Sequence, residues 1–351
     1  MITPEPRPGL RGIEPYEAPQ LDVRARLNTN ECPYPLPEGF RRELAEAVGS
    51  QALNRYPDRE ALELRAALAE HAGHAVEGTW AANGSNEVIE QLLLAYGGPK
   101  RRVVVFEPTY LLHRRLAWIA HSEVERVELE PPWRIHADDM VRKHRHGHPA
   151  VVFICSPNNP TGNAQDPDIV AATAELAKGE LFIVDEAYIE FGGASMLPHL
   201  ERLPNLVIVR TFSKAFALAG ARIGYCLTSP QVVEDLRRVR LPYHLSSLTQ
   251  TAGIVALRHA REAATILDRV REQRDRIAAA LPGLGVEAFP SDANFVLFRP
   301  PGSAAQVWQG LLDRGVLVRD LSAVVPGCLR VTAGTPEEVD LFLSALEEVL
   351  A

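Results

Sequence analysis

The sequence predicts an α/β fold, with a large domain built on a mostly parallel, helix-covered sheet and a smaller α+β domain after it. Two observations lead to this prediction. Four short apolar runs lack polar alternation, a pattern typical of parallel strands buried on both faces. They are VVVF (103–106), VVFI (151–154), LFIV (181–184) and LVIV (206–209). The 351 residues also suffice for two domains of about 150 residues each.

The chain before the first of these runs is predicted to hold an arm, two helices and a strand. Prolines at positions 4, 6, 8, 15 and 19 deny residues 1–25 a helix, so we expect an extended arm. Apolar residues recur at helical spacing over 38–49 and 58–72, which predicts two helices. A strand is expected at 79–82, before a helix that opens at Asn83-Gly84-Ser85-Asn86-Glu87.

The later elements complete the predicted domain division. The stretch RTFSKAFALAGARIGY (210–225) is expected to be a strand that turns into a helix. A charged amphipathic segment at 260–281 leads to strands near 285–298 and 327–333, and the helix PEEVDLFLSALEEVLA ends the chain. We therefore predict an arm over 1–25, a large domain over 26–258 and a small domain over 259–351.

Composition excludes several classes of protein. A net charge of -8 offers no broad basic field, so no nucleic-acid partner is expected. The four cysteines form no CxxC pair and are expected to be reduced thiols. The N-terminus lacks the apolar core of a signal peptide, and no stretch approaches the ~18 apolar residues of a membrane span. These features predict a soluble cytoplasmic protein without a membrane partner.

One tract could suggest a metal. KHRHGH (143–148) brings three histidines together, but alternation with Arg and Lys is more typical of a solvated turn. No metal site is predicted.

The strongest functional signal lies in the residues directly after successive strands, because ligands of open α/β sheets sit at the carboxyl ends of the strands. Gly84, Ser85 and Asn86 come after the first strand and could cradle a phosphate at a helix N-terminus. The later strands are followed by the Asn159 amide, by Asp185 with Tyr188, and by Thr211, Ser213 and Lys214. Each motif alone is a common cap or turn. Together they match the needs of pyridoxal phosphate: an amine for its aldehyde, a carboxylate for its ring nitrogen, donors for its 3-oxygen and a phosphate clamp.

The order of PNNPTG (157–162), DEAY (185–188) and SKAFALAGARIGY (213–225) resembles the fold type I aminotransferases over nearly the whole chain. In detail the sequence is similar to the histidinol-phosphate aminotransferase family. The further agreements include RLNTNECPYP (26–35), NRYPD (54–58), EPTY (107–110), SDANFVLF (291–298) and CLRVTAGT (328–335).

The resemblance implies a role for each residue of the cofactor site. Lys214 forms the Schiff base and then moves the proton. Asp185 holds the protonated ring nitrogen, and Asn159 and Tyr188 bond the 3-oxygen. Tyr110 stacks on the ring. The phosphate contacts are expected from Gly84, Ser85, Asn86, Thr211, Ser213, Arg222 and, across a shared homodimer site, the partner's copy of Tyr56.

The resemblance also implies the substrates. Arg330 matches the arginine that grips a carboxylate, and Arg319 and Tyr16 match residues that help hold a substrate phosphate, with Asn30 at the same entrance. The reaction expected is transfer of the amino group of L-histidinol phosphate to 2-oxoglutarate, in histidine biosynthesis. Three alternatives stay open: an aromatic amino acid aminotransferase, a threonine-phosphate decarboxylase and, with little weight, a non-catalytic sensor.

Overall fold

The computed structural model describes residues 4, 5, 7, 10, 15, 19–136, 138–139, 147–177 and 179–351. Tyr16, most of the predicted arm and residues 143–146 of the histidine-rich tract lie outside the described residues. Within the described part, no helix is long and apolar enough to cross a membrane.

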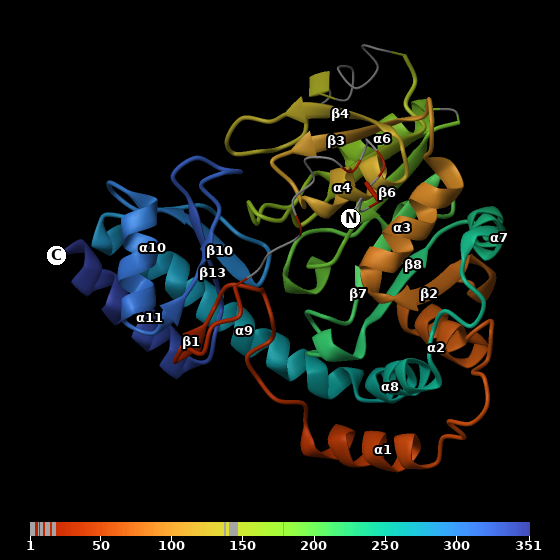
Figure 1. The fold of residues 1–351 in the computed structure, drawn as a ribbon, viewed down its shortest axis with the longest axis horizontal. Helices are drawn as coiled ribbons and strands as arrows, with labels where there is room; N and C mark the ends of the chain where they lie inside the picture. The colour runs from red at the N-terminus through yellow and green to blue at the C-terminus, as the bar shows by residue number, and fades with distance from the viewer. Residues whose placement is uncertain are drawn as a thin grey trace.

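A seven-stranded sheet forms the centre of the larger part of the molecule (Figure 1), with its strands in the order β2-β8-β7-β6-β5-β3-β4. All neighbouring pairs are parallel except those that β8 makes with β2 and β7. The predicted mostly parallel sheet is thus confirmed. Its strands are β2 Thr79–Asn83, β3 Arg102–Glu107, β4 Glu123–Glu128, β5 Val151–Cys155, β6 Leu181–Asp185, β7 Leu206–Thr211 and β8 Ile223–Leu227.

Helices cover both faces of this sheet, which explains why its strands read as unbroken apolar runs. In β5, Val152 and Ile154 face one core, whereas Val151 and Phe153 face the other. The first core is closed by α2 Leu62–Ala72, α6 Pro167–Leu176 and α8 Ser247–Arg258, and α1 Glu38–Gly49 packs on α8. The second core is closed by α3 Gly84–Tyr96, α4 Leu112–Ile119 and α7 Pro230–Val239.

The C-terminal part is an antiparallel four-stranded sheet packed on helices, in the order β12-β13-β10-β9. Its strands are β9 Glu287–Ala288, β10 Phe295–Arg299, β12 Arg319–Asp320 and β13 Leu329–Thr332, and its helices are α9 Ala260–Ala280, α10 Ala304–Asp313 and α11 Pro336–Leu350. This part has its own core. The predicted α+β character is confirmed, while the boundary at residue 258 stays a prediction.

The N-terminal segment joins this C-terminal core. Strand β1 (Ala25–Arg26) pairs in parallel with β11 (Val316–Leu317), and in Figure 1 the red β1 lies among the blue C-terminal elements. Ala25 and Leu27 are buried in that core. Residues 28–31 then pass directly along the pocket described below.

Short 3₁₀ turns complete the described elements. They are η2 Val76–Gly78, η3 Ile189–Phe191, η4 Leu197–His199, η5 Ala219–Ala221 and η6 Leu281–Leu284.

Two expectations need correction. The stretch 210–225 does not turn into a helix: β7 ends at Thr211, turns and η5 come next, and β8 begins at Ile223. The backbone must reverse so that β8 can pair antiparallel to β7, and Ala217 and Arg222 adopt positive φ angles of 54° and 55° in doing so. Pairing therefore overrides the helix propensity of the Ala-Leu run. The helix expected from residue 58 begins at Leu62, because the Asp58 carboxylate accepts the backbone N–H groups of residues 60 and 62.

Candidate active site

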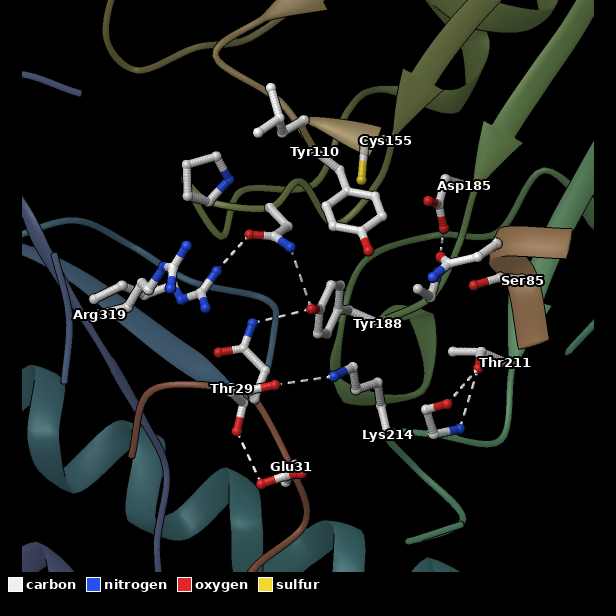
Figure 2. Close-up of a pocket in the computed structure, with 18 of the residues that line it drawn as sticks. Thr29, Glu31, Ser85, Tyr110, Cys155, Asp185, Tyr188, Thr211, Lys214 and Arg319 are labelled. Atoms are coloured by element: carbon white, nitrogen blue, oxygen red, sulfur yellow. Dashed lines mark hydrogen bonds between the residues drawn. The ribbon is translucent and has the colours of Figure 1, made fainter. Parts of the chain in front are cut away.

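One pocket brings together most of the residues singled out in the sequence. It lies at the carboxyl ends of the parallel strands, and Arg319 of β12 and Arg330 of β13 line one side of it. Figure 2 shows Arg319 on that side, across the pocket from Asp185 and Ser85. The predicted residues that line it are Asn30, Ser85, Asn86, Tyr110, Asn159, Asp185, Tyr188, Thr211, Ser213, Lys214, Arg222, Arg319 and Arg330. Parallel strands that end at one edge account for this convergence.

Lys214 reaches into the pocket from the loop after β7. Its Nζ donates a hydrogen bond of 3.2 Å to the backbone carbonyl of Thr29. Burial is the main cause that lowers the pKa of Lys214 to about 8; the neighbouring guanidinium groups of Arg330 and Arg222 contribute to this lowering, and the charge of Glu31 opposes it. The side chain is therefore an amine that can be neutral near physiological pH, as a nucleophile or a base requires.

Asp185 ends β6 and is 2% exposed. Its Oδ1 accepts the Ala187 N–H at 3.1 Å, and its Oδ2 accepts a hydrogen bond from His113 Nε2 at 3.0 Å. The His113 ring is fully buried and stacks on Phe153 with ring centroids 4.7 Å apart. The partner of this buried acid is thus an imidazole.

Sequence reasoning missed His113. It is the second residue of α4, and its backbone N–H donates to the carbonyl of Tyr110, three residues earlier, at 3.1 Å in the turn before the helix. The two rings meet edge to face, with centroids 5.5 Å apart. The position of His113, three residues after the tyrosine of EPTY, is the sequence signal that could have identified it.

Tyr188 presents its hydroxyl to the same cavity. The hydroxyl accepts a hydrogen bond from Asn30 Nδ2 at 2.9 Å and a longer one from Asn159 Nδ2 at 3.5 Å (Figure 2). Burial raises the pKa of Tyr188 to about 12, so the phenol keeps its proton at neutral pH. A phenol in this state can donate to an oxygen in the pocket.

An anion cradle lies where α3 begins. Gly84 has φ +80°, and a Cβ there would lie 2.4 Å from Arg222 Nη2. Arg222 Nη1 lies 3.3 Å from Ser213 Oγ, and the Thr211 and Ser213 hydroxyl oxygens are 3.0 Å apart. Free N–H groups at the helix N-terminus, hydroxyls and a guanidinium make a set of donors suited to a phosphate.

Two arginines form the wall contributed by the C-terminal sheet. Arg319 and Arg330 are partners in the register of β12 and β13. Arg330 is 7% exposed, donates to Asn159 Oδ1 at 2.5 Å and to the Asn28 carbonyl at 3.1 Å, and its guanidinium carbon lies 4.9 Å from the Phe295 ring centroid. Planar guanidinium groups suit carboxylates and phosphates, so this wall favours an anionic substrate.

Two predicted residues have surroundings unlike those of the others, and only Asn30 differs from the expectation, because Tyr56 was expected to serve the partner's site. Tyr56 does not line the pocket of its own chain: it is 79% exposed and stacks on Tyr243, with ring centroids 4.4 Å apart. Asn30 lines the pocket but is only 1% exposed, and its amide bonds to Tyr188 and Thr332. It is a buried structural neighbour of Tyr188 rather than a residue at the open entrance. Among the described residues, no group of three or more potential ligands could hold a metal ion.

Known proteins share both the sequence and the fold. The family model for aminotransferase class I and II matches residues 25–346. The histidinol-phosphate aminotransferase of Frankia casuarinae is 50% identical, with 98% of this chain and 90% of the relative covered. That of Thermobifida fusca is 47% identical, with 97% and 94% covered.

A crystal structure extends the comparison to three dimensions. Histidinol-phosphate aminotransferase from Sinorhizobium meliloti, in complex with pyridoxal-5'-phosphate, is 24% identical and matches with a TM-score of 0.88, over 98% of this chain and 97% of that one. This likeness confirms the fold. With the family match and the two relatives, it leads to one conclusion: the chain belongs to the class I and II aminotransferases, and within them to the histidinol-phosphate aminotransferase family.

Proposed function

We propose that this chain uses pyridoxal phosphate to transfer the amino group of L-histidinol phosphate to 2-oxoglutarate, giving imidazole-acetol phosphate and L-glutamate in histidine biosynthesis. The observation that carries the proposal is the Lys214 amine, with its lowered pKa, in one pocket with the Asp185 carboxylate and the anion cradle. The names of the relatives support the choice of substrate.

The residues present fit pyridoxal phosphate. When bound, the cofactor supplies an aldehyde and an electron-withdrawing ring. Its phosphate suits the cradle, because the missing Cβ of Gly84 leaves room for the Arg222 guanidinium. The phosphate would be held by Ser85, Asn86, Thr211, Ser213 and Arg222. The ring nitrogen would be held by Asp185, the ring face by Tyr110 and the 3-oxygen by Asn159 and Tyr188.

Two side chains carry the proton chemistry in this proposal. Lys214 must be neutral to bond an aldehyde or to accept a proton, and its lowered pKa provides that form near pH 8. It then moves a proton at the substrate carbon that bears the amino group. The Asp185 carboxylate would hold a proton on the ring nitrogen, and a charge-assisted hydrogen bond of this kind contributes about 1.5–3 kcal/mol.

The arginine wall binds both substrates in turn. Arg330 and Arg319 serve the carboxylate of glutamate and the phosphate of histidinol phosphate, because both groups are anions that a guanidinium can pair. The contact between Tyr16 and the phosphate of the substrate stays a prediction.

We further propose a homodimer in which the partner's copy of Tyr56 reaches the cofactor phosphate. The high exposure of Tyr56, its place outside its own pocket and the neighbouring exposed Leu53, Leu241 and Tyr243 support an interface at this surface. The four cysteines are free, which fits a reducing cytoplasm.

Rapid-mixing absorbance on the cofactor-loaded enzyme tests the reaction. Histidinol phosphate and glutamate should each convert the cofactor spectrum, and phenylalanine should do so far more slowly. Conversion by glutamate and phenylalanine without histidinol phosphate would favour the aromatic aminotransferase and contradict the proposed substrate. Carbon dioxide release from threonine phosphate without a keto acid would instead indicate the decarboxylase. Lys214→Ala is the matched control and should show no conversion.

A further inference from the structure

The side-chain amides of Asn30 and Asn159 both donate to the Tyr188 hydroxyl, and residues of strand β13 bond the oxygens of both amides. Asn159 Oδ1 accepts from Arg330 Nη1, while Asn30 Oδ1 accepts from Thr332 Oγ1 at 3.1 Å. Arg330 and Thr332 are two residues apart and therefore lie on the same face of the strand. Each amide oxygen is occupied, so each amide nitrogen is turned toward Tyr188 (Figure 2).

Asn30 is the more tightly held of the two amides. Its backbone has φ 55°, a left-handed conformation that asparagine adopts more readily than most residues. Its N–H donates to Thr332 Oγ1 at 3.0 Å, and its carbonyl accepts from Asn294 Nδ2 at 3.1 Å. Because the Thr332 hydroxyl accepts from the backbone and donates to the side chain of Asn30, the orientation of the amide is fixed by the network.

The consequence concerns the proton of Tyr188. A phenol has one proton and can accept hydrogen bonds on its oxygen. Two NH₂ groups point at that oxygen, and neither can accept its proton. The remaining direction for the O–H bond is the open pocket.

We propose that Asn30, oriented by Thr332, is a positioning residue that makes Tyr188 donate its proton into the pocket, to the 3-oxygen of the cofactor. The inference rests on the proposed function, since it needs the cofactor in place. In this role a fully buried asparagine would help to set the pKa of the imine that Lys214 would form with the cofactor. A hydrogen-bond donor at the 3-oxygen stabilises the negative charge of that oxygen and so favours loss of the imine proton.

The test is a pH titration of the visible absorption band of the cofactor-loaded enzyme. Asn30→Ala should move the midpoint to higher pH by about 0.5–1 unit, the size expected for one hydrogen bond. Thr332→Val should move it in the same direction by less, because the amide loses its orientation but stays present. The charged groups around Tyr188, which are Lys214, Arg330 and Asp185 with the Cys155 thiol nearby, are unchanged in these variants.

A double-mutant cycle separates this role from general support of the loop. Tyr188→Phe should also raise the midpoint, and Asn30→Ala should add no further shift in the Tyr188→Phe background. Asn294→Ala is the matched control, because it removes another buried asparagine bonded to residue 30 but leaves the amide that faces Tyr188. Its midpoint should stay near that of the unmodified enzyme.

Three results would overturn the inference: an unchanged midpoint in Asn30→Ala, an equal shift in Asn294→Ala, or additive shifts in the double variant. A protein that never develops the visible band would instead refute the proposed cofactor, so the two failures are distinguishable.

Discussion

His113 donates a hydrogen bond of 3.0 Å to Asp185 Oδ2 from a ring that is itself fixed by stacking on Phe153. The imidazole thus fixes the orientation of the Asp185 carboxylate, which can then accept a hydrogen bond from a protonated group in the pocket. His113→Phe keeps an aromatic ring against Phe153 but removes the donor. We expect turnover to fall by about 10-fold to 100-fold, the equivalent of one hydrogen bond to a charged group, with cofactor still bound.

His113→Gln is the matched variant, because an amide nitrogen can replace the imidazole N–H. It should recover most of the lost turnover. Steady-state kinetics on both loaded variants, with cofactor content measured by absorbance, check the prediction. Equal turnover in the unmodified enzyme and His113→Phe would show that Asp185 needs no positioning by this ring.

A glycine is required at position 84 because the Arg222 guanidinium occupies the space that a Cβ there would need. In Gly84→Ala, the new Cβ would lie 2.4 Å from Arg222 Nη2, so the guanidinium must shift from its position in the anion cradle. We expect the dissociation constant for pyridoxal phosphate to rise by about 10-fold or more, the loss expected for one charge-assisted contact.

Gly285→Ala controls for backbone strain in this comparison. Gly285 has a similar φ of +73° but no atom within 4 Å of its built Cβ, and it lies outside the pocket. Equilibrium titration with the cofactor should leave Gly285→Ala near the unmodified protein. A matching loss of affinity in both variants would mean that strain, not the position of Arg222, sets the affinity.

The Lys214 amine should govern how fast the cofactor-free protein takes up the aldehyde. Only the neutral amine reacts, and its pKa of about 8 means that the neutral fraction, and so the rate, rises as the pH increases through 8. Arg330→Gln removes a neighbouring positive charge, which raises the pKa of Lys214 and moves the rate profile to higher pH. Stopped-flow absorbance at several pH values measures the profile.

Arg319→Gln is the control for this prediction. It removes an arginine from the adjacent strand, whereas the charges that shift the pKa of Lys214 most are those of Arg330, Glu31 and Arg222. Its profile should keep the midpoint of the unmodified protein. If Arg330→Gln also keeps that midpoint, Arg330 does not contribute to the lowered pKa, and burial with the charge of Arg222 must account for it.

Linear order in the sequence explains why part of the predicted set lines one pocket, but not all of it. Residues such as Asn159, Asp185 and Lys214 come after apolar strands, and parallel strands end at one edge, so linear order was enough to bring them together. His113 comes from a helix, and its contact with Asp185 depends on how α4 packs against the sheet. No strand-end rule could find it.

The same limit explains the other differences. The segment with Lys214 was expected to become a helix, but antiparallel pairing of β8 with β7 decides its path, and pairing is a long-range interaction. Asn30 precedes the large sheet in sequence but is held by β13, close to the other end of the chain. Its amide therefore gave no local signal of contact with Tyr188.

Glu190 should make the stability of the protein depend on pH. Burial raises its pKa to about 7, with Arg210 opposing, and its Oε2 has no hydrogen-bond partner in the described part of the chain. A folded-state pKa above the ordinary value means that its contribution to stability is complete at low pH and is lost as the pH rises through 7. Glu190→Gln should avoid that loss.

The side chain is partly exposed, so we expect Glu190→Gln to gain about 1–2 kcal/mol relative to the unmodified protein between pH 5 and pH 8, or about 1–3 °C in melting temperature. Calorimetry at the two pH values measures the gain. Glu46→Gln, at an exposed position on α1, should gain nothing. A gain for Glu190→Gln that is the same at both pH values would show that the carboxyl does not titrate in this range.

Tyr56 provides the sharpest test of a shared site, because its ring lies outside the pocket of its own chain. Tyr56→Ala should weaken cofactor binding and abolish activity at limiting cofactor, and Lys214→Ala should be inactive throughout. If the partner's copy of Tyr56 completes each site, a mixed dimer of the two variants has one intact site and one doubly defective site. Random exchange then gives half mixed dimers, so activity should return to about one quarter of the unmodified level. If instead each tyrosine serves its own chain, the mixed dimer contains no intact site. Activity that stays at the level of the unmixed variants, while light scattering shows dimers, would therefore place the phosphate contact within one subunit.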